Sequence, residues 1–215
     1  MKETKKTIAL QIAEELAQRI ANGKLSPNEH LVETKLAEEF HTSRAPIREA
    51  LLMLEKERLV TRVPHHGFVV KKFSKKEIHQ LYDATFRLEE IAMAKAVENV
   101  TDHDIQQLEE ILAGQWAAIE SDDIVSYYSL NEKFHETIFA IANNEFLAEM
   151  HHSLRKSSRP LSVLNMGQGR NMHASYEEHR RQLDALKLRD KEAGIQAIRD
   201  QESRSLKTLD IFYPM

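Results

Sequence analysis

Two sets of residues in the sequence have types and spacings that could perform chemistry. The first is Arg44 and Arg48, which stand four residues apart on either side of Pro46 in the segment SRAPIREALLMLEKERLV. Four residues is close to one helical turn, so the two guanidinium groups would share one face of a helix and could grip an anion. The second is His135 and His179, which lie on the apolar faces of two predicted amphipathic helices. Buried imidazoles need partners, which are usually core hydrogen bonds and otherwise a metal or a ligand.

Pro46 predicts that a helix begins just before it. Proline in a helix interior costs about 3 kcal/mol, but the first turn tolerates it because the N–H groups there have no intrahelical partner. With Ser43 or Thr42 as the N-cap, Arg44 occupies the first helical position. Two cations near a helix N-terminus oppose the macrodipole and repel each other. This arrangement favours a bound anion in front of the helix.

The elements around this helix predict a winged helix-turn-helix over residues 1–73. Isoleucine and leucine at four-residue spacing predict a first helix at 7–21, and shorter patterns predict helices at about 33–40 and 44–57. RLVTRV and GFVVKK, separated by Pro-His-His-Gly, read as a hairpin. Such a fold places the start of its second helix in the DNA major groove. The alternative is that both arginines are ordinary solvated side chains, with Arg48 paired to Glu55 or another neighbour.

Residues 74–215 are predicted to form a second, all-α domain. Capping-box patterns begin at Ser74 and Thr101. Helices are expected at about 75–98, 102–120, 123–142, 144–164, 170–189 and 191–211. The fold class is therefore mainly α, with an N-terminal winged helix-turn-helix and a C-terminal helical bundle.

Charge and composition narrow the range of partners. Residues 1–72 carry 13 Lys and Arg against 10 Asp and Glu, whereas residues 73–215 carry 17 against 24. A polyanion would therefore meet the first segment. The chain has no cysteine and no apolar run of 18 residues, so we expect no disulfide, no thiol chemistry and no membrane span. A cytoplasmic location fits best.

The segment LAEEFHTSRAPIREALLMLEKERLVTRVPHHGFVV resembles the N-terminal domain of the GntR family of bacterial transcription regulators, whose pattern is LA…SR.PVREAL..LE..GLV…..G..V. The resemblance implies binding to double-stranded operator DNA, with arginines on bases and phosphates and the wing tip approaching the minor groove. The DNA-binding residues that it implies are Thr34, Ser43, Arg44, Pro46, Arg48, His66 and Gly67. Arg58 departs from the pattern, because the family usually has glycine there.

Residues 78–209 resemble the FCD domain of FadR-type GntR regulators through LYDATFRLEEIAMAKAV, NEKFHETIFAIANNEFL and EEHRRQLDAL. Many such domains hold a divalent metal through an Asp and a His four residues apart and two further histidines. Here Asn131 replaces the Asp and Gln201 aligns with the last histidine, whereas His135 and His179 remain. The resemblance implies a weak Zn²⁺ or Ni²⁺ site at these four residues, since charge and donor strength are lost. The alternative is that they hydrogen-bond a small organic anion directly.

The resemblance also implies a small-molecule effector, expected to be a carboxylate. Thr85 stands where an arginine is common in the family, and Arg87 or Arg159 would replace that cation. The predicted effector-binding residues are Thr85, Arg87, Asn131, His135 and His179. Two other features have simpler predicted roles: Trp116 as a core residue and His151-His152 as surface residues.

The expected function is a ligand-responsive regulator, most often a repressor in this family, that binds DNA as a homodimer. The alternative from another class is a metal-dependent hydrolase built on His135 and His179. Against it, no carboxylate has an obvious general-base role and no G-x-S-x-G motif occurs. We therefore expect no enzymatic activity.

Overall fold

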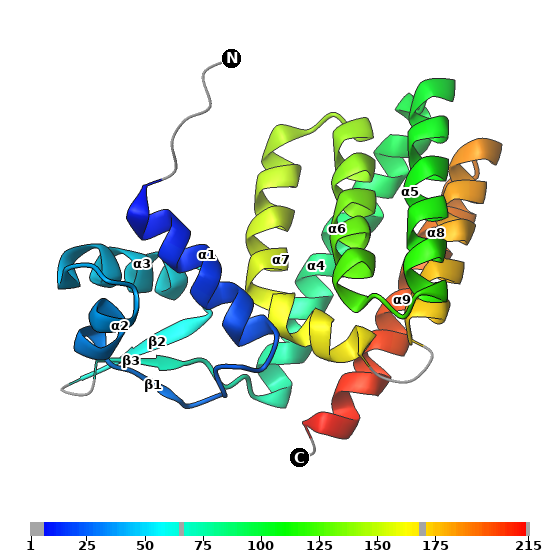
Figure 1. Ribbon diagram of the computed structural model, residues 1–215. Coiled ribbons are helices and arrows are strands. Elements are labelled where there is room, and N and C mark those ends of the chain that lie inside the picture. The colour runs from blue at the N-terminus through cyan, green and yellow to red at the C-terminus, as the bar shows by residue number, and fades with distance from the viewer. Residues whose placement is uncertain (1–6, 65–66, 168–170, 214–215) are drawn as a thin grey trace. The chain divides into compact units, whose positions relative to one another are not determined.

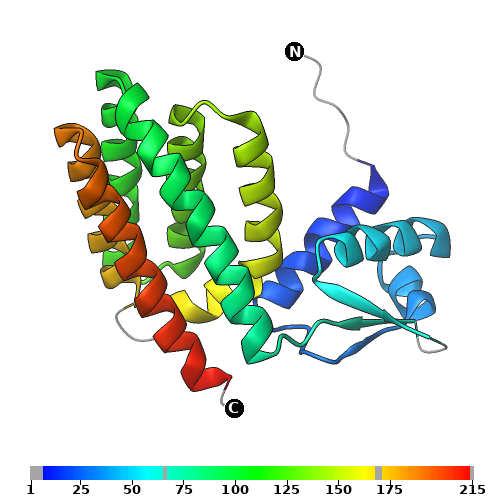
Figure 2. The same ribbon diagram turned by 180° about the vertical axis from the view of Figure 1, so that it is seen from behind.

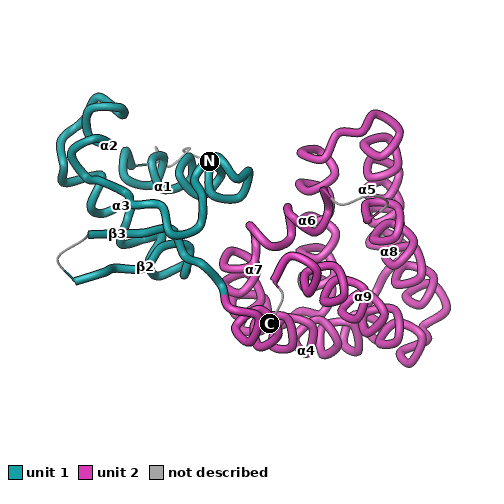
Figure 3. Tube along the Cα trace, turned by 90° about the horizontal axis from the view of Figure 1, so that it is seen from below, with its two compact units in different colours: residues 1–73 teal, residues 74–215 magenta. Residues whose placement is uncertain are grey.

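The structure is a computed structural model that describes residues 7–64, 67–167 and 171–213. The chain divides into two compact units, Met1–Phe73 and Ser74–Met215, which Figure 3 distinguishes by colour.

Unit 1 is a winged helix-turn-helix (Figure 1). In the residues described, its elements are α1 (Ile8–Ala21), β1 (His30–Leu31), α2 (Glu33–Glu39), α3 (Arg44–Lys56), β2 (Val60–Val63) and β3 (Gly67–Val70). The antiparallel sheet has the order β1-β3-β2, with Leu31 opposite Phe68 and Val63 opposite Gly67. The predicted fold class is confirmed. The strand β1 was not predicted, because two residues are too short to show an alternating pattern.

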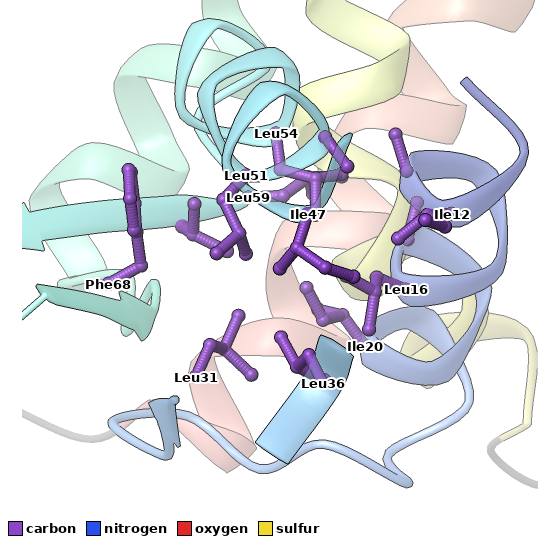
Figure 4. Packing of buried hydrophobic residues seen from close by; sticks show 14 of the residues in the cluster. Ile12, Leu16, Ile20, Leu31, Leu36, Ile47, Leu51, Leu54, Leu59 and Phe68 are labelled. Atoms are coloured by element: carbon purple, nitrogen blue, oxygen red, sulfur yellow. The ribbon is translucent and has the colours of Figure 1, made fainter. Parts of the chain in front are cut away.

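The apolar faces of α1 and α3 meet in one core that fixes the position of α3. Leu16, Ile47, Leu51 and Leu54 are each 0% exposed. Figure 4 shows these side chains converging with those of Leu36 and others from the surrounding elements. Because the buried stripe of α3 is locked in this core, the opposite face of the helix must point to solvent.

The N-terminus of α3 has the geometry that the proline predicts. Ser43 is the N-cap, and Arg44 is the first helical residue. The Ser43 side chain makes no capping hydrogen bond. An N-cap side chain usually accepts from the third helical N–H, but here Pro46 occupies that position and has no N–H. The Ser43 hydroxyl therefore stays available to an external partner.

The backbone at the C-terminus of α3 explains why glycine is usual in the family at the position that Arg58 occupies here. Arg58 has φ +59°, in the left-handed region. Its N–H donates to the Glu55 carbonyl at 2.9 Å, and the Leu59 N–H donates to the Leu54 carbonyl at 2.9 Å. These are the two hydrogen bonds of a Schellman motif, in which glycine avoids the steric penalty of a side chain.

Unit 2 is an all-helical bundle, shown from opposite sides in Figures 1 and 2. Within the residues described, the helices are α4 (Lys75–Asn99), α5 (Asp102–Glu120), α6 (Ile124–Ile141), α7 (Glu145–Met166), α8 (Asn171–Leu188) and α9 (Lys191–Phe212). The helices pack on one another in the order α4, α9, α8, α5, α6, α7 and back to α4, and α4 also packs on α6. In this order, helices distant in sequence share one interior.

The helix boundaries agree closely with those predicted from the sequence. Both predicted capping boxes are present, Ser74 with Glu77 and Thr101 with Asp104. One prediction about packing is wrong: Trp116 is 40% exposed rather than buried in the core. Its ring packs edgewise and obliquely on His173 and Tyr176, with centroids 6.0 and 5.2 Å away. The stripe of α5 that faces the interior passes through Gln115 instead.

We expect Arg58→Gly to stabilise the protein. Glycine adopts the left-handed conformation without the cost of about 1–2 kcal/mol that a side chain incurs, although its greater freedom in the unfolded chain removes part of the gain. The net increase in the free energy of unfolding should be about 0.5–1 kcal/mol. Urea denaturation measures it. Arg58→Ala is the control, since alanine keeps the steric penalty; an equal gain in both variants would contradict the explanation.

Candidate functional site

The exposed face of α3 presents two cations at its N-terminus. Arg44 and Arg48 both lie on the surface, and Ile47 between them is buried. The Arg44 Nη2 donates to Glu33 Oε2 at 2.9 Å, which fixes its orientation while 65% of its side chain stays exposed. In the described part of the chain, Arg48 forms no ion pair, so the alternative pairing with Glu55 does not occur. Both guanidinium groups can reach an anion in front of α3.

The other predicted DNA-binding residues flank this helix. Thr34 is exposed in the first turn of α2, and Pro46 is partly buried in the first turn of α3. Gly67 starts β3 with φ +79°, a conformation that favours glycine and turns the chain at the wing. His66 lies outside the described residues.

The interior of unit 2 is lined with polar side chains, and many of them are buried. In the described residues they include Thr85, Glu89, Gln115, Asn131, His135, His151, Glu178, His179, Gln182 and Gln201. Buried polar atoms in native proteins nearly always have partners. Those without one are positions that an ordered water, an ion or a ligand can satisfy.

His179 is held as a neutral ring with one free lone pair. Its Nδ1 lies 3.0 Å from the Gln115 Oε1, an acceptor, so Nδ1 carries the proton and Nε2 does not. The Nε2 atom is buried and has no hydrogen-bond partner. Burial, with the nearby charges of Arg155 and Arg204, lowers the pKa of His179 to about 3. A neutral imidazole whose lone pair has no partner can act as a metal ligand or as a hydrogen-bond acceptor.

Asn131 and His135 supply two more free acceptor atoms on α6. The Asn131 Nδ2 donates to Glu132 Oε1 at 3.2 Å, which leaves Oδ1 as the unpartnered end of the amide. The His135 Nε2 is also buried without a partner. Burial first, and then the charge of Arg155, lowers the pKa of His135 and keeps it neutral. Both residues are at most 3% exposed, so these atoms are removed from bulk solvent.

The two histidines lie next to each other, although 44 residues separate them in the sequence. Their ring centroids are 5.2 Å apart at an interplanar angle of 85°. Phe134 stacks on the His179 ring with centroids 4.3 Å apart and fixes its plane. The structure therefore brings together His135 and His179, with Asn131 one turn from His135 on α6.

Gln201 is less available than the other predicted ligands. Its Oε1 accepts a hydrogen bond from the Gln182 Nε2 at 3.0 Å. Within the described residues, no group of three or more His, Cys, Asp or Glu side chains is arranged to hold a metal. A metal at this position would therefore depend on the amide oxygen of Asn131 together with the two imidazoles, and three unpartnered donors of these types suit a borderline divalent cation.

The predicted effector contacts on α4 are already engaged. The Thr85 hydroxyl donates to the Leu81 carbonyl at 2.8 Å. The Arg87 guanidinium bonds to Glu90 and Glu202, so its charge is neutralised. Arg159, on α7, differs from them: its guanidinium lies 5.5 Å from the Tyr128 ring centroid, and its Nε is buried without a partner. Of the two candidate cations, Arg159 is the better placed to accept an anion.

Sequence reasoning missed several residues that shape this interior. His151 was expected on the surface, but it is 4% exposed and its Nε2 lies 2.9 Å from Glu89 Oε1. Arg155 bonds to Glu132. Burial alone would lower the pKa of Arg155, but the charges of Glu132 and Glu89 raise it instead. This fixed cation is the common reason, after burial, that both interior histidines stay neutral.

Comparison with known proteins adds to this geometry. Residues 8–70 match the bacterial regulatory proteins of the gntR family, and residues 80–201 match the FCD domain. The chain belongs to the GntR family. The transcriptional regulator McbR of Escherichia coli is 30% identical over 191 residues, which cover 86% of this chain and 85% of McbR. The gluconate operon transcriptional repressor of Bacillus licheniformis is 31% identical over 88% of this chain and 79% of its own length.

The similarity of the fold to a solved GntR structure agrees with the family assignment. The solved structure of E. coli McbR/YncC superposes with a TM-score of 0.81 and 27% identity, and covers 97% of this chain and all of that one. The chain is thus a transcription regulator with a DNA-binding domain and an FCD domain. GntR-type regulators bind DNA and FCD domains bind small-molecule effectors. In the residues described, no helix is long and apolar enough to cross a membrane.

We expect the metal-free protein to lose stability as the pH falls below about 6.5. The folded-state pKa of His179 is depressed to about 3, so below pH 6.5 the unfolded chain takes up a proton that the folded chain excludes. The loss between pH 6.5 and pH 5 should be about 2 kcal/mol for this histidine.

Urea unfolding of chelator-treated protein at the two pH values measures this loss. His179→Gln should flatten the pH dependence by that amount, whereas His103→Gln, which changes an exposed histidine, should leave it unaltered. An unchanged pH dependence in His179→Gln would contradict the neutral buried ring.

Proposed function

We propose that this GntR regulator is a cytoplasmic, ligand-responsive repressor that binds operator DNA as a homodimer. The observation that carries the ligand-responsive part is the set of three buried, unpartnered acceptors, Asn131 Oδ1, His135 Nε2 and His179 Nε2. Leaving such atoms unsatisfied costs about 1–3 kcal/mol each, which a bound ligand would recover. Repression is consistent with the name of the gluconate operon repressor among its relatives.

The DNA contact is assigned to the N-terminal half of α3. Arg48 is free to bind guanine bidentately or to grip a phosphate, and Arg44 is oriented by Glu33 for the same groove. The free Ser43 hydroxyl and exposed Thr34 are suited to phosphate contacts. Gly67, and His66 beside it, are assigned to the wing contact. Helix-turn-helix proteins bind two half-sites about one helical turn apart, which is the reason for proposing a homodimer.

The interior site is assigned to a divalent cation, Zn²⁺ or Ni²⁺. Asn131, His135 and His179 would hold it, and Gln201 would join only by releasing Gln182. Such an ion would supply a Lewis-acid centre that a carboxylate or hydroxyl oxygen of the effector can ligate. The protein's own part is to keep both imidazoles neutral and oriented, through burial, Gln115 and Phe134.

The effector is proposed to be a small carboxylate. Arg159 is the interior cation without a carboxylate partner among the described residues, and its stacking on Tyr128 leaves the guanidinium edge for an anion. The relatives named for a gluconate operon fit a hydroxy acid of this kind. Thr85 and Arg87 would serve as walls of the site rather than as anchors.

Arg48→Ala should weaken binding to operator DNA. Loss of a base contact is expected to cost about 1–3 kcal/mol, and loss of a phosphate contact should reduce the salt dependence by about one ion. Fluorescence anisotropy with a DNA site selected from a random pool by the wild-type protein measures both.

Arg180→Ala is the matched control, because it removes the same charge from an exposed position in unit 2. It should leave DNA affinity unchanged. Equal affinities for wild type and Arg48→Ala would remove α3 from the DNA interface.

Native mass spectrometry of untagged protein, purified without chelators, tests the assembly and the ion together. We expect the mass of two chains with one divalent ion each. His135→Gln should retain the dimer mass and lose the ion, because two of the remaining donors would be amides. A monomer would refute the proposed dimer, and a metal-free wild-type dimer would refute the proposed ion.

A further inference from the structure

Glu89 is a buried carboxylate that forms no ion pair with an arginine or lysine among the residues described. It lies on α4 and is 3% exposed. Its Oε1 is 2.9 Å from the His151 Nε2 and 3.5 Å from the His135 Nδ1, and its Oε2 has no hydrogen-bond partner. A carboxylate removed from water is stable only where other groups compensate its charge. Two imidazoles that approach the same oxygen are an unusual choice of partners.

The neighbouring cation, Arg155, compensates the charge of Glu89 only at a distance. Arg155 is close enough to interact with Glu89 electrostatically, but its guanidinium hydrogen bond goes to Glu132. His151 is held in place by stacking on Phe139, with ring centroids 3.9 Å apart and an angle of 17°. His151 therefore anchors one oxygen of Glu89 beside the His135 ring.

The position of Glu89 determines which way His135 presents its lone pair. The two nitrogens of an imidazole lie on different edges of the ring, so a carboxylate beside Nδ1 favours the proton there and leaves Nε2 unprotonated. The His135 Nε2 is the atom that is buried without a partner. The same logic operates on His179, where Gln115 occupies the Nδ1 side. Both rings therefore have an unprotonated Nε2, but the group beside Nδ1 is a carboxylate at His135 and a neutral amide at His179.

We propose that Glu89 is a positioning residue for the divalent ion, and that it supplies through His135 the negative charge that Asn131 does not carry. This inference rests on the metal site proposed above. The direct donors Asn131, His135 and His179 are all neutral, so an ion among them would lack an anionic ligand. A carboxylate close to the second N–H of a ligating histidine raises the basicity of that ligand and favours one tautomer, and the 3.5 Å between the His135 Nδ1 and Glu89 Oε1 would shorten to a hydrogen bond when the ion binds.

The test is the affinity of the full-length, chelator-stripped protein for Zn²⁺ alone, measured by isothermal titration calorimetry. Glu89→Gln keeps the shape of the side chain and removes its charge. Loss of such an outer partner should weaken Zn²⁺ binding about 10- to 100-fold. Glu90→Gln is the matched control: Glu90 is the next residue on α4, its side chain is 13% exposed, and its carboxylate bonds to Arg87 and Arg199 rather than to either histidine.

Two further variants separate positioning from a merely structural role. His151→Gln removes the second imidazole, but the glutamine amide can donate to Glu89 as the His151 Nε2 does and so keep Glu89 beside His135; Zn²⁺ affinity should stay close to that of wild type. Glu89→Asp keeps the charge and should retain more affinity than Glu89→Gln, even if Glu89→Gln folds poorly. The visible absorption of bound Co²⁺ gives a second readout, since altered His135 ligation changes the spectrum while a simple loss of stability does not.

The outcomes are distinguishable. Equal Zn²⁺ affinities for wild type, Glu89→Gln and Glu89→Asp would overturn the role of Glu89 and leave the metal site standing. An equal loss in His151→Gln and Glu89→Gln would also overturn it, because Glu89 would then act through His151. A wild-type protein that binds no Zn²⁺ would overturn both the inference and the proposed ion, and would leave DNA binding by α3 untouched.

Discussion

The cost of burying polar atoms inside a bundle of helices governs the chemistry of unit 2. Asn131, His135 and His179 are removed from water, yet each keeps an acceptor atom without a partner. Their other polar ends are satisfied or oriented by Glu132, Glu89 and Gln115. Burial keeps the imidazoles uncharged, and the fixed cation Arg155 reinforces this. The interior is thereby prepared to donate lone pairs rather than protons.

In unit 1 the packing of α1 against α3 determines which side chains are available for binding. The fully buried Ile47, Leu51 and Leu54 determine which face of α3 is exposed, and this face carries Arg44 and Arg48. Pro46 starts the helix and also removes the N–H that Ser43 would otherwise cap. The same local sequence therefore fixes the backbone and leaves polar groups unsatisfied at the surface. Such groups are stabilised by an anion in front of the helix.

Much of this could be predicted from the sequence. Helical spacing, capping boxes and the position of Pro46 gave the elements to within a few residues, because these signals are local. The direction of His179 into the interior was also readable from its stripe. The partners of the interior histidines could not be predicted. Gln115, Glu89 and His151 come from three other helices, and one sequence cannot specify which interior side chains meet. One local signal does point to Gln115 and Glu89: each is a polar residue within the apolar stripe of its helix, α5 and α4 respectively.

The length of α4 has a mechanical consequence. It is one uninterrupted helix of 25 residues, and Glu89 lies 14 residues after its first residue, Lys75, or about 21 Å along the axis. Only residues 71–74 separate that first turn from the last residue of β3. A helix behaves as a stiff rod over this length. A tilt that ligand binding imposes at Glu89 is therefore a tilt of the whole of α4, down to its first turn at Lys75.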